Sequence, residues 1–309
     1  MTRIKQNVEY ERGFKYRSED LRFATPKAVA DYRAKRLSCD TLLEIGAGVG
    51  FQTIAFSRTC NKVIAVEIDK ERFKFLKINL DKAKNTVLIN GDALKEDLQA
   101  DVIFVDTERE PSEKERTLDT IKPNIKKILE KFKNKNICIE VPPQTRNIEL
   151  NCEKEYVSLH NKLNRLNLYF NDLKKCETSL VLLPEKVFLN DKNKEKLKLI
   201  TDYENYSYIY EINPAVIRAD LLGSISNKEL FLYNGGNKFY FFSNTLIDSK
   251  FLKPYRILKD NSTLGKVILH GNVSPADYIR IKRSIESIMP GKVTGHVFLL
   301  KENLFAEEI

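Results

Sequence analysis

The stretch Leu42-Leu43-Glu44-Ile45-Gly46-Ala47-Gly48-Val49-Gly50 decides how this chain folds. It is an apolar segment that runs into three glycines at alternate positions, and the residues 51–57 that follow have a helical pattern. Glycine permits positive φ and, because it has no Cβ, allows a ligand to approach the main chain. A strand, a glycine turn and a helix N-terminus in this order predict a corner that binds a nucleotide-like ligand.

Three later apolar segments end in the same way. Residues 62–66 lead into Glu67, residues 86–90 lead into Gly91-Asp92-Ala93, and residues 100–105 lead into Asp106. Glu67 follows the first glycine by about twenty residues, where an acid can accept hydrogen bonds from a ribose diol. Because parallel strands present their carboxyl ends at one edge, we expect a ligand site there. A sheet of this type without a ligand is the alternative.

The spacing of the glycines separates two kinds of nucleotide site. A dinucleotide fold has the pattern GxGxxG, whereas this chain has E-x-G-x-G-x-G, an acid after the second strand and G-D-A after the third. This combination resembles the class I S-adenosylmethionine-dependent methyltransferases. The resemblance implies that the glycines and Glu44 flank the methionine part of the cofactor, that Glu67 holds the ribose hydroxyls, and that Asp92 and Ala93 contact the adenine. The residues expected at the cofactor are Thr25, Glu44, Gly46, Ala47, Gly48, Gly50, Phe51, Glu67, Ile68, Asp92, Ala93 and Asp106.

Two further segments narrow the resemblance. The helix that begins at Ala24-Thr25-Pro26 and the segment Pro214-Ala215-Val216-Ile217-Arg218-Ala219 occur in the same order in methyltransferases that carry a C-terminal THUMP-like domain. That resemblance covers about residues 20–301 and implies an RNA substrate, with tRNA favoured. The resemblance is weaker evidence for the substrate than for the cofactor, because the substrate is inferred from the type of domain and not from residues of a binding site. Thr25 is expected to cap the helix, and residues 23–26 to form a lid over the cofactor.

The pattern of the whole chain predicts an α/β fold with two domains. Residues 42–141 alternate strands and helices, which predicts a mostly parallel Rossmann-like sheet. Residues 156–160, 166–170 and 178–183 are expected to add antiparallel closing strands. The charged run 191–196 separates a methyltransferase domain, residues 1–190 with an N-terminal helical lid, from a smaller α+β THUMP-like domain, residues 195–309.

Composition limits the partners. The formal net charge is +9, which fits either a polyanionic partner or an ordinary lysine-rich surface. Five scattered cysteines and three histidines predict no metal site, no disulfide framework and no histidine-based triad. No apolar run reaches the length of a membrane span, and residues 1–10 lack a signal-peptide core, so a cytoplasmic location is expected.

The reaction centre is expected after the fourth strand. Base amino-methyltransferases often place D/N-P-P-Y/F there, whereas this chain has Asp106-Thr107-Glu108-Arg109, without the prolines and the aromatic residue. By resemblance, Asp106 and Arg109 are the candidate catalytic residues; the alternative is that Asp106 only caps a turn and Arg109 pairs with Glu108 or Glu110. Arginines expected to contact the substrate are Arg33, Arg36, Arg116, Arg280 and Arg283. An RNA methyltransferase is the leading hypothesis, against a non-catalytic binding protein or an enzyme acting on DNA or protein.

Overall fold

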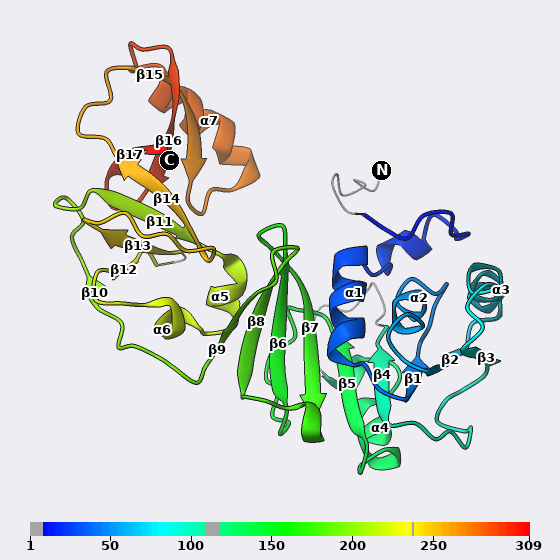
Figure 1. Cartoon of the computed structure of the whole chain (residues 1–309). Coiled ribbons are helices and arrows are strands. Elements are labelled where there is room, and N and C mark those ends of the chain that lie inside the picture. Colours follow the sequence, from blue (N-terminus) through cyan, green and yellow to red (C-terminus); the bar gives the residue numbers. More distant parts are fainter. Residues whose placement is uncertain (1–8, 109–117, 237) are drawn as a thin grey trace. The chain divides into compact units, whose positions relative to one another are not determined.

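The structure is a computed structural model that describes residues 9–108, 118–236 and 238–309 (Figure 1). The chain divides into two compact units, Met1–Asn190 and Asp191–Ile309. Arg109 and Arg116 lie outside the described residues, so the roles predicted for them stay predictions. In the described part of the chain, no helix is long and apolar enough to cross a membrane.

The first unit is built on a mixed sheet. In its described part the sheet has nine strands in the order β3-β2-β1-β4-β5-β7-β6-β8-β9. The strands are β1 (Thr41–Ile45), β2 (Lys62–Glu67), β3 (Thr86–Asn90), β4 (Val102–Asp106), β5 (Asn136–Val141), β6 (Glu153–Leu159), β7 (Lys162–Phe170), β8 (Thr178–Leu183) and β9 (Val187–Asn190). The first five strands are parallel to one another, as the alternation of strands and helices predicted.

One expectation about the closing strands is wrong. β7 is antiparallel to both β5 and β6, but β6 and β8 pair in parallel. The period-two pattern that predicted these strands fixes which side chains face each side of a sheet, and it carries no information about strand direction. The closing region is therefore mixed.

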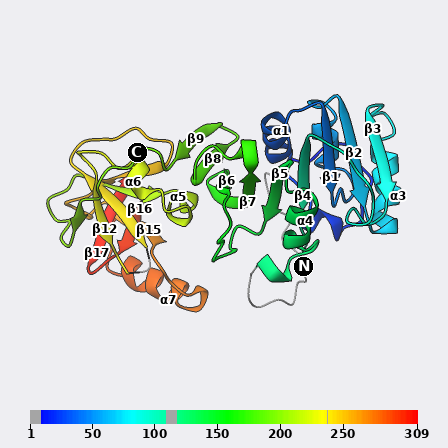
Figure 2. The ribbon, with the colours of Figure 1, turned by 90° about the horizontal axis from the view of Figure 1, so that it is seen from below.

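Helices cover both faces of this sheet (Figure 2). Two residues of α1, Ala30 and Ala34, pack with Phe56 of α2 against strand residues of one face, while Ile125 and Ile128 of α4 are buried. The helices are η1 (Asp20–Arg22), α1 (Lys27–Arg36), α2 (Thr53–Phe56), α3 (Lys70–Asn79), η2 (Leu118–Thr120), α4 (Ile125–Lys131) and η3 (Asn171–Leu173).

The start of α1 also differs from the prediction. Its N-cap is Pro26 rather than Thr25, and no side chain caps it. Pro26 has ψ 142°, which is extended, so the helix begins one residue later than a Pro at the first helical position would place it.

The second unit is an α+β unit on a second sheet. Its described part has eight strands in the order β10-β12-β13-β11-β14-β17-β16-β15. They are β10 (Leu199–Ile200), β11 (Tyr208–Ile212), β12 (Phe231–Asn234), β13 (Phe239–Ser243), β14 (Leu252–Ile257), β15 (Leu264–His270), β16 (Val293–Leu299) and β17 (Asn303–Glu308), with helices α5 (Pro214–Arg218), α6 (Leu222–Ile225) and α7 (Pro275–Glu286). The last strand, β17, was not predicted.

α7 covers one face of this second sheet. Its Ile281 and Ile285 pack on Val267 and Val297 of β15 and β16. Ser274 caps α7 and accepts a hydrogen bond from Asp277 N at 3.1 Å. In the same way Asn213 caps α5.

Candidate functional site

The surroundings of the three glycines after β1 explain why each position has no side chain. A Cβ at Gly46 would come within 2.5 Å of the Asp106 carbonyl oxygen, and one at Gly50 within 2.4 Å of Leu80. Gly48 also has positive φ, +58°, but a Cβ there would meet nothing within 4 Å. The outer two glycines therefore allow β4 and α3 to pack closely, and Gly48 borders open space in which a ligand can reach the main chain.

Glu67, at the end of β2, is tied to this turn. Its Oε2 accepts a hydrogen bond from Gly48 N at 2.7 Å, and its Oε1 accepts one from Asp69 N at 2.7 Å. Burial raises the pKa of this carboxyl, while the two backbone N–H groups oppose the rise. The turn and the predicted ribose-binding acid are thus one hydrogen-bonded unit.

Glu44 lies within β1 and is almost fully buried. Its Oε2 has no hydrogen-bond partner among the described residues. Burial, the largest cause, raises its pKa to about 8. A buried carboxyl oxygen without a hydrogen-bond partner destabilises the folded protein. Glu44 is therefore a candidate to bind a polar group of a ligand.

Asp106 ends β4 beside Glu140, the residue paired with it on β5. Burial and the neighbouring Glu140 raise the pKa of Asp106 well above its ordinary value, while Arg33 and Arg165 oppose the rise. Arg165 Nε lies 2.7 Å from Glu140 Oε1, and Arg33 pairs with Glu140 Oε2. Two carboxyls and two guanidiniums therefore meet behind the end of β4.

The two residues that follow Asp106 are held in place. Thr107 Oγ1 donates to the Glu140 carbonyl oxygen at 2.6 Å. The backbone of Glu108 pairs with that of Lys122, and its carboxylate pairs with Arg72 of α3. Threonine and glutamate thus supply contacts that fix the chain where the common motif has prolines.

The strand register brings the predicted cofactor residues to one edge. β1 lies between β2 and β4, so Gly46 lies beside the ends that carry Glu67 and Asp106. Gly91 N donates to the Glu67 carbonyl oxygen, which brings the Asp92 turn to the same edge. Ala47, Ala93 and Thr25 are buried in this region of the first unit. Whether these residues bind a cofactor stays a prediction.

Two of the predicted cofactor residues are placed differently from the rest. Phe51 is buried and stacks on Phe14, with Tyr10 and Tyr16 also against its ring. Ile68 is 69% exposed next to Glu67. Phe51 therefore already packs with the N-terminal segment, and Ile68 is open to contact.

Arg33 and Arg36, which were expected to contact the substrate, are placed among acidic side chains of the first unit instead of on an open basic surface. Arg33 is fully buried, where it pairs with Glu140, donates to Gln52 and Asn167, and lies 4.6 Å from the ring of Phe104. Arg36 lies between Glu153 and Glu155, with its guanidinium 3.7 Å from the ring of Tyr169. Both are held by carboxylates inside the first unit.

Arg280 and Arg283 lie on α7 of the second unit and are exposed. Arg280 pairs with Asp277 at 2.8 Å, with its side chain 75% exposed. These two residues remain available to a polyanion.

Sequence reasoning missed Glu140 and Arg165. Glu140 interrupts the apolar run of β5 one residue before its end, as Glu44 does in β1, and this was a signal that could have been read. Arg165 had no such signal, because it meets Glu140 only through the antiparallel pairing of β7 with β5.

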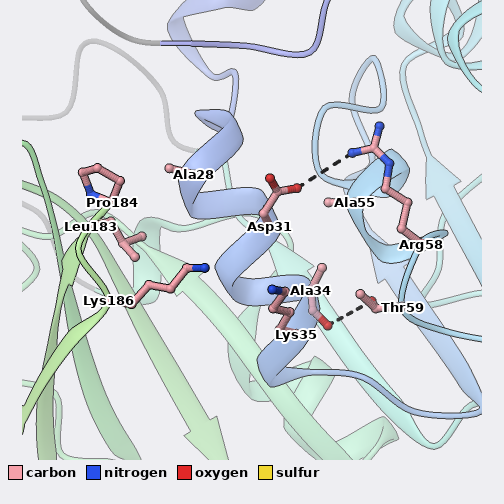
Figure 3. Close-up of a pocket in the computed structure, with 10 residues that line it drawn as sticks. All are labelled: Ala28, Asp31, Ala34, Lys35, Ala55, Arg58, Thr59, Leu183, Pro184 and Lys186. Atoms are coloured by element: carbon pink, nitrogen blue, oxygen red, sulfur yellow. Dashed lines mark hydrogen bonds and ion pairs between the residues drawn. The ribbon is translucent and has the colours of Figure 1, made fainter.

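A separate pocket of about 470 Å³ lies along α1 (Figure 3). Alanines of α1 and α2 and Leu183 line it together with Lys35, Arg58 and Lys186. Arg58 pairs with Asp31, as drawn, and with Glu11. No residue expected at the cofactor lines this pocket, so it is distinct from the edge where β1, β2 and β4 end.

Known proteins resemble the first unit in sequence. Residues 29–131 match the family "Ribosomal RNA adenine dimethylase". The probable ribosomal RNA small subunit methyltransferase A of Methanosarcina acetivorans is 50% identical over 58 residues, 19% of this chain and 22% of that protein. The Clostridioides difficile protein of this type is 38% identical over 60 residues. The match thus spans about a fifth of the length of these relatives.

A solved structure extends the likeness to the fold of nearly the whole chain. The putative methyltransferase of Porphyromonas gingivalis has a TM-score of 0.74 and 14% identity, over 94% of this chain and 82% of that one. The first unit therefore has the fold of a methyltransferase, and residues 29–131 of it are similar in sequence to S-adenosylmethionine-dependent methyltransferases. The comparisons do not show the THUMP-like character predicted for the second unit.

The first unit has residues that fit S-adenosylmethionine. Gly48 leaves open space beside the main chain, Glu67 lies next to it, and the Glu44 oxygen lacks a partner. No group of three or more His, Cys, Asp or Glu side chains that could hold a metal ion occurs among the residues described.

Proposed function

We propose that this protein is an S-adenosylmethionine-dependent RNA methyltransferase. The observation that carries the proposal is the edge itself, where Gly48 opens toward solvent, Glu67 binds its backbone and Asp106 ends the neighbouring strand. The family match over residues 29–131 supports an RNA base as the substrate, and the printed names of the relatives favour ribosomal RNA. A preference for tRNA stays a prediction without support from the relatives.

When bound, S-adenosylmethionine supplies an electrophilic methyl group on a sulfonium. The chain's own part is to bind, to orient the nucleophile and to handle one proton. In this proposal Glu67 accepts hydrogen bonds from the ribose while it keeps Gly48 in place, and Glu44 meets the methionine part.

Asp106 is the proposed catalytic residue. Its raised pKa makes the carboxylate a stronger base than an exposed aspartate, and its place at the end of β4 faces the ligand edge. Glu140 and Arg165 position it from behind through their ion pair. The missing aromatic residue of the common motif leaves base stacking to another group.

Basic residues of each unit, taken separately, are proposed to contact the substrate, and Arg33 and Arg36 are not among them. Arg280 and Arg283 of α7 are exposed. Lys35 and Lys186 line the α1 pocket, and no ion pair of either is found among the described residues. RNA is preferred to DNA because of the family match, and a protein substrate fits the basic balance less well. A THUMP-like second domain and a cytoplasmic location stay proposals.

The test is methyl transfer from labelled S-adenosylmethionine to purified cellular RNA fractions. Asp106→Ala should lower turnover by roughly a hundredfold or more while cofactor affinity, measured by calorimetry, changes little. The matched control is Asp101→Asn, at the opposite end of β4, where the carboxylate only accepts a hydrogen bond from Thr41 N. This control should keep its activity.

Two outcomes would overturn the proposal. If Asp106→Ala folds, binds cofactor and methylates at the wild-type rate, Asp106 has no catalytic role. If the wild type binds both cofactor and RNA but methylates no RNA fraction, the protein is better described as a non-catalytic binding protein, which fits the presence of Thr107 and Glu108 where the common motif has prolines. Methylation of DNA or protein alone would replace RNA as the substrate.

A further inference from the structure

Two cysteines of the methyltransferase domain lie next to each other. Cys39 follows α1 and Cys60 precedes β2, and their sulfur atoms are 3.9 Å apart. Both are free thiols. Cys60 is buried, whereas Cys39 is partly exposed, so a small solute can reach the pair from the side of Cys39.

The sheet register accounts for this approach. Thr41 of β1 pairs with Lys62 of β2, and Lys62 N donates to the Asp40 carbonyl oxygen at 2.9 Å. Two residues before each member of the pair are Cys39 and Cys60. Neighbouring strands lie about 4.8 Å apart, which is within the range of roughly 4.4–6.8 Å between Cα atoms joined by a disulfide.

The surroundings hold both chain segments in place. Cys60 packs in the same buried cluster as Leu37, Leu42 and Val63, and Cys39 packs against that cluster. The hydrogen bond between the thiols lowers the pKa of Cys60 and raises the pKa of Cys39, so Cys60 is the member of the pair that forms a thiolate more readily.

We propose that Cys39 and Cys60 form a reversible disulfide when the protein meets a peroxide. One sulfur takes an oxygen from the peroxide and becomes a sulfenic acid, with release of one water. The other sulfur attacks it, so that an S–S bond forms, the S–O bond breaks, and a second water leaves with the thiol proton. One peroxide is reduced to two waters, and two thiols are oxidised to one disulfide.

The bond encloses the part of the chain that forms the cofactor edge. The loop of about 22 residues between the two sulfurs contains β1, the glycine turn and α2. A crosslink at its base removes conformational freedom from the unfolded chain without touching Gly48 or Glu67. The oxidised domain should therefore be more resistant to heat and should still bind its cofactor.

The experiment treats the full chain with hydrogen peroxide at about one equivalent and follows it by intact-mass and peptide mass spectrometry. The mass should fall by about 2 Da, one peptide pair should join Cys39 to Cys60, and a dithiol should reverse both changes. The melting temperature should rise by roughly 5–10 °C. Cys39→Ser should abolish the crosslink, whereas Cys176→Ser, at another partly exposed cysteine, should leave it intact.

The wild type alone can refute the proposal, so the result does not depend on a variant that folds. A peptide map in which Cys39 gains oxygen atoms, or in which it is linked to another cysteine, would show that the pair does not close. Unchanged, fully alkylatable thiols after peroxide would show the same. A Cys39–Cys60 bond that lowers the melting temperature would overturn the inference that the native geometry accommodates it.

Discussion

Two helices carry basic residues in similar sequence patterns, but the residues of one helix are buried and those of the other are exposed. α1 of the first unit ends in Arg33, Lys35 and Arg36, and α7 of the second unit carries Arg280, Lys282 and Arg283. Arg33 is buried beneath α1 among carboxylates, whereas Arg280 is exposed on α7. The first unit uses arginine to build its interior, and the second presents it to solvent.

The difference comes from what each helix covers. Val29, Ala30, Tyr32 and Ala34 are buried around most of the circumference of α1. The side chain of Arg33, which lies between them, therefore does not reach solvent. It is tolerated because Glu140, Asn167 and Gln52 provide partners. α7 buries a single narrow stripe, and its charged residues lie on the other side.

The largest expected effect is the loss of Arg33. Arg33→Met removes a guanidinium that Glu140, Asn167 and Gln52 share, and leaves those buried groups with fewer partners. We expect a loss of about 3–5 kcal/mol in the free energy of unfolding, measured with urea. Arg283→Met on α7 should change it by about 0.5 kcal/mol or less.

A double variant sharpens this test. Arg33→Met with Glu140→Gln removes both charges, so it should recover part of the loss. If Arg33→Met alone is as stable as Arg283→Met, the contrast between the two helices is wrong.

The second prediction uses the buried acid of β1. The folded pKa of Glu44 is raised to about 8 from an ordinary value of 4.5, so the native state binds more protons than the unfolded state between these values. Stability from this group is therefore fully present below about pH 4.5 and is lost as pH rises toward 8. In the wild type, the free energy of unfolding should therefore differ between low and high pH by roughly 2–4 kcal/mol more than in Glu44→Gln. Urea unfolding of both proteins at pH 5 and pH 8 measures it, and parallel curves would contradict the assignment.

The third prediction concerns Glu67, which is buried and already bonded to Gly48 N. Glu67→Gln keeps one acceptor for the turn but loses the charged acceptor for a ribose. Calorimetry should show S-adenosylmethionine binding weakened by about 1–3 kcal/mol. The control is Glu71→Gln, which changes an exposed glutamate on α3 that pairs with Lys74. Equal losses in both variants would remove Glu67 from the site.

Local pattern predicted much of the first unit and little of its interior. β3 has the predicted bounds, because the run Thr86–Asn90 is largely apolar and rich in β-branched residues. The helix after the glycine turn is shorter than predicted, Thr53–Phe56. Helix ends depend on contacts that periodicity does not contain.

The positions of candidate residues were predictable where they lie at the end of a single strand. Glu67 and Asp106 could be named because each follows an apolar run directly. The surroundings of Arg33 could not be predicted, because its partners Glu140 and Asn167 are 107 and 134 residues away along the chain. Burial by distant residues is a property of the tertiary fold, and an arginine at the end of a helix gives no sign of it.

The smallest expected effect concerns α7, and it tests whether the exposed arginines of this helix bind RNA. If Arg280 and Arg283 contact phosphates, Arg280→Gln with Arg283→Gln should weaken RNA binding by about tenfold at moderate salt. It should also reduce the slope of log affinity against log salt by roughly 1.5, because each lost phosphate contact releases fewer counterions. Fluorescence anisotropy across a salt series measures both quantities. The matched control is Lys259→Gln with Lys292→Gln, which removes the same charge from the second unit away from α7. An equal drop in the control would mean that only net charge matters. An unchanged slope in the α7 variant would remove Arg280 and Arg283 from the RNA-binding surface, so that neither the arginines of α7 nor those of α1, which already pair with Glu140, Glu153 and Glu155, would contact RNA.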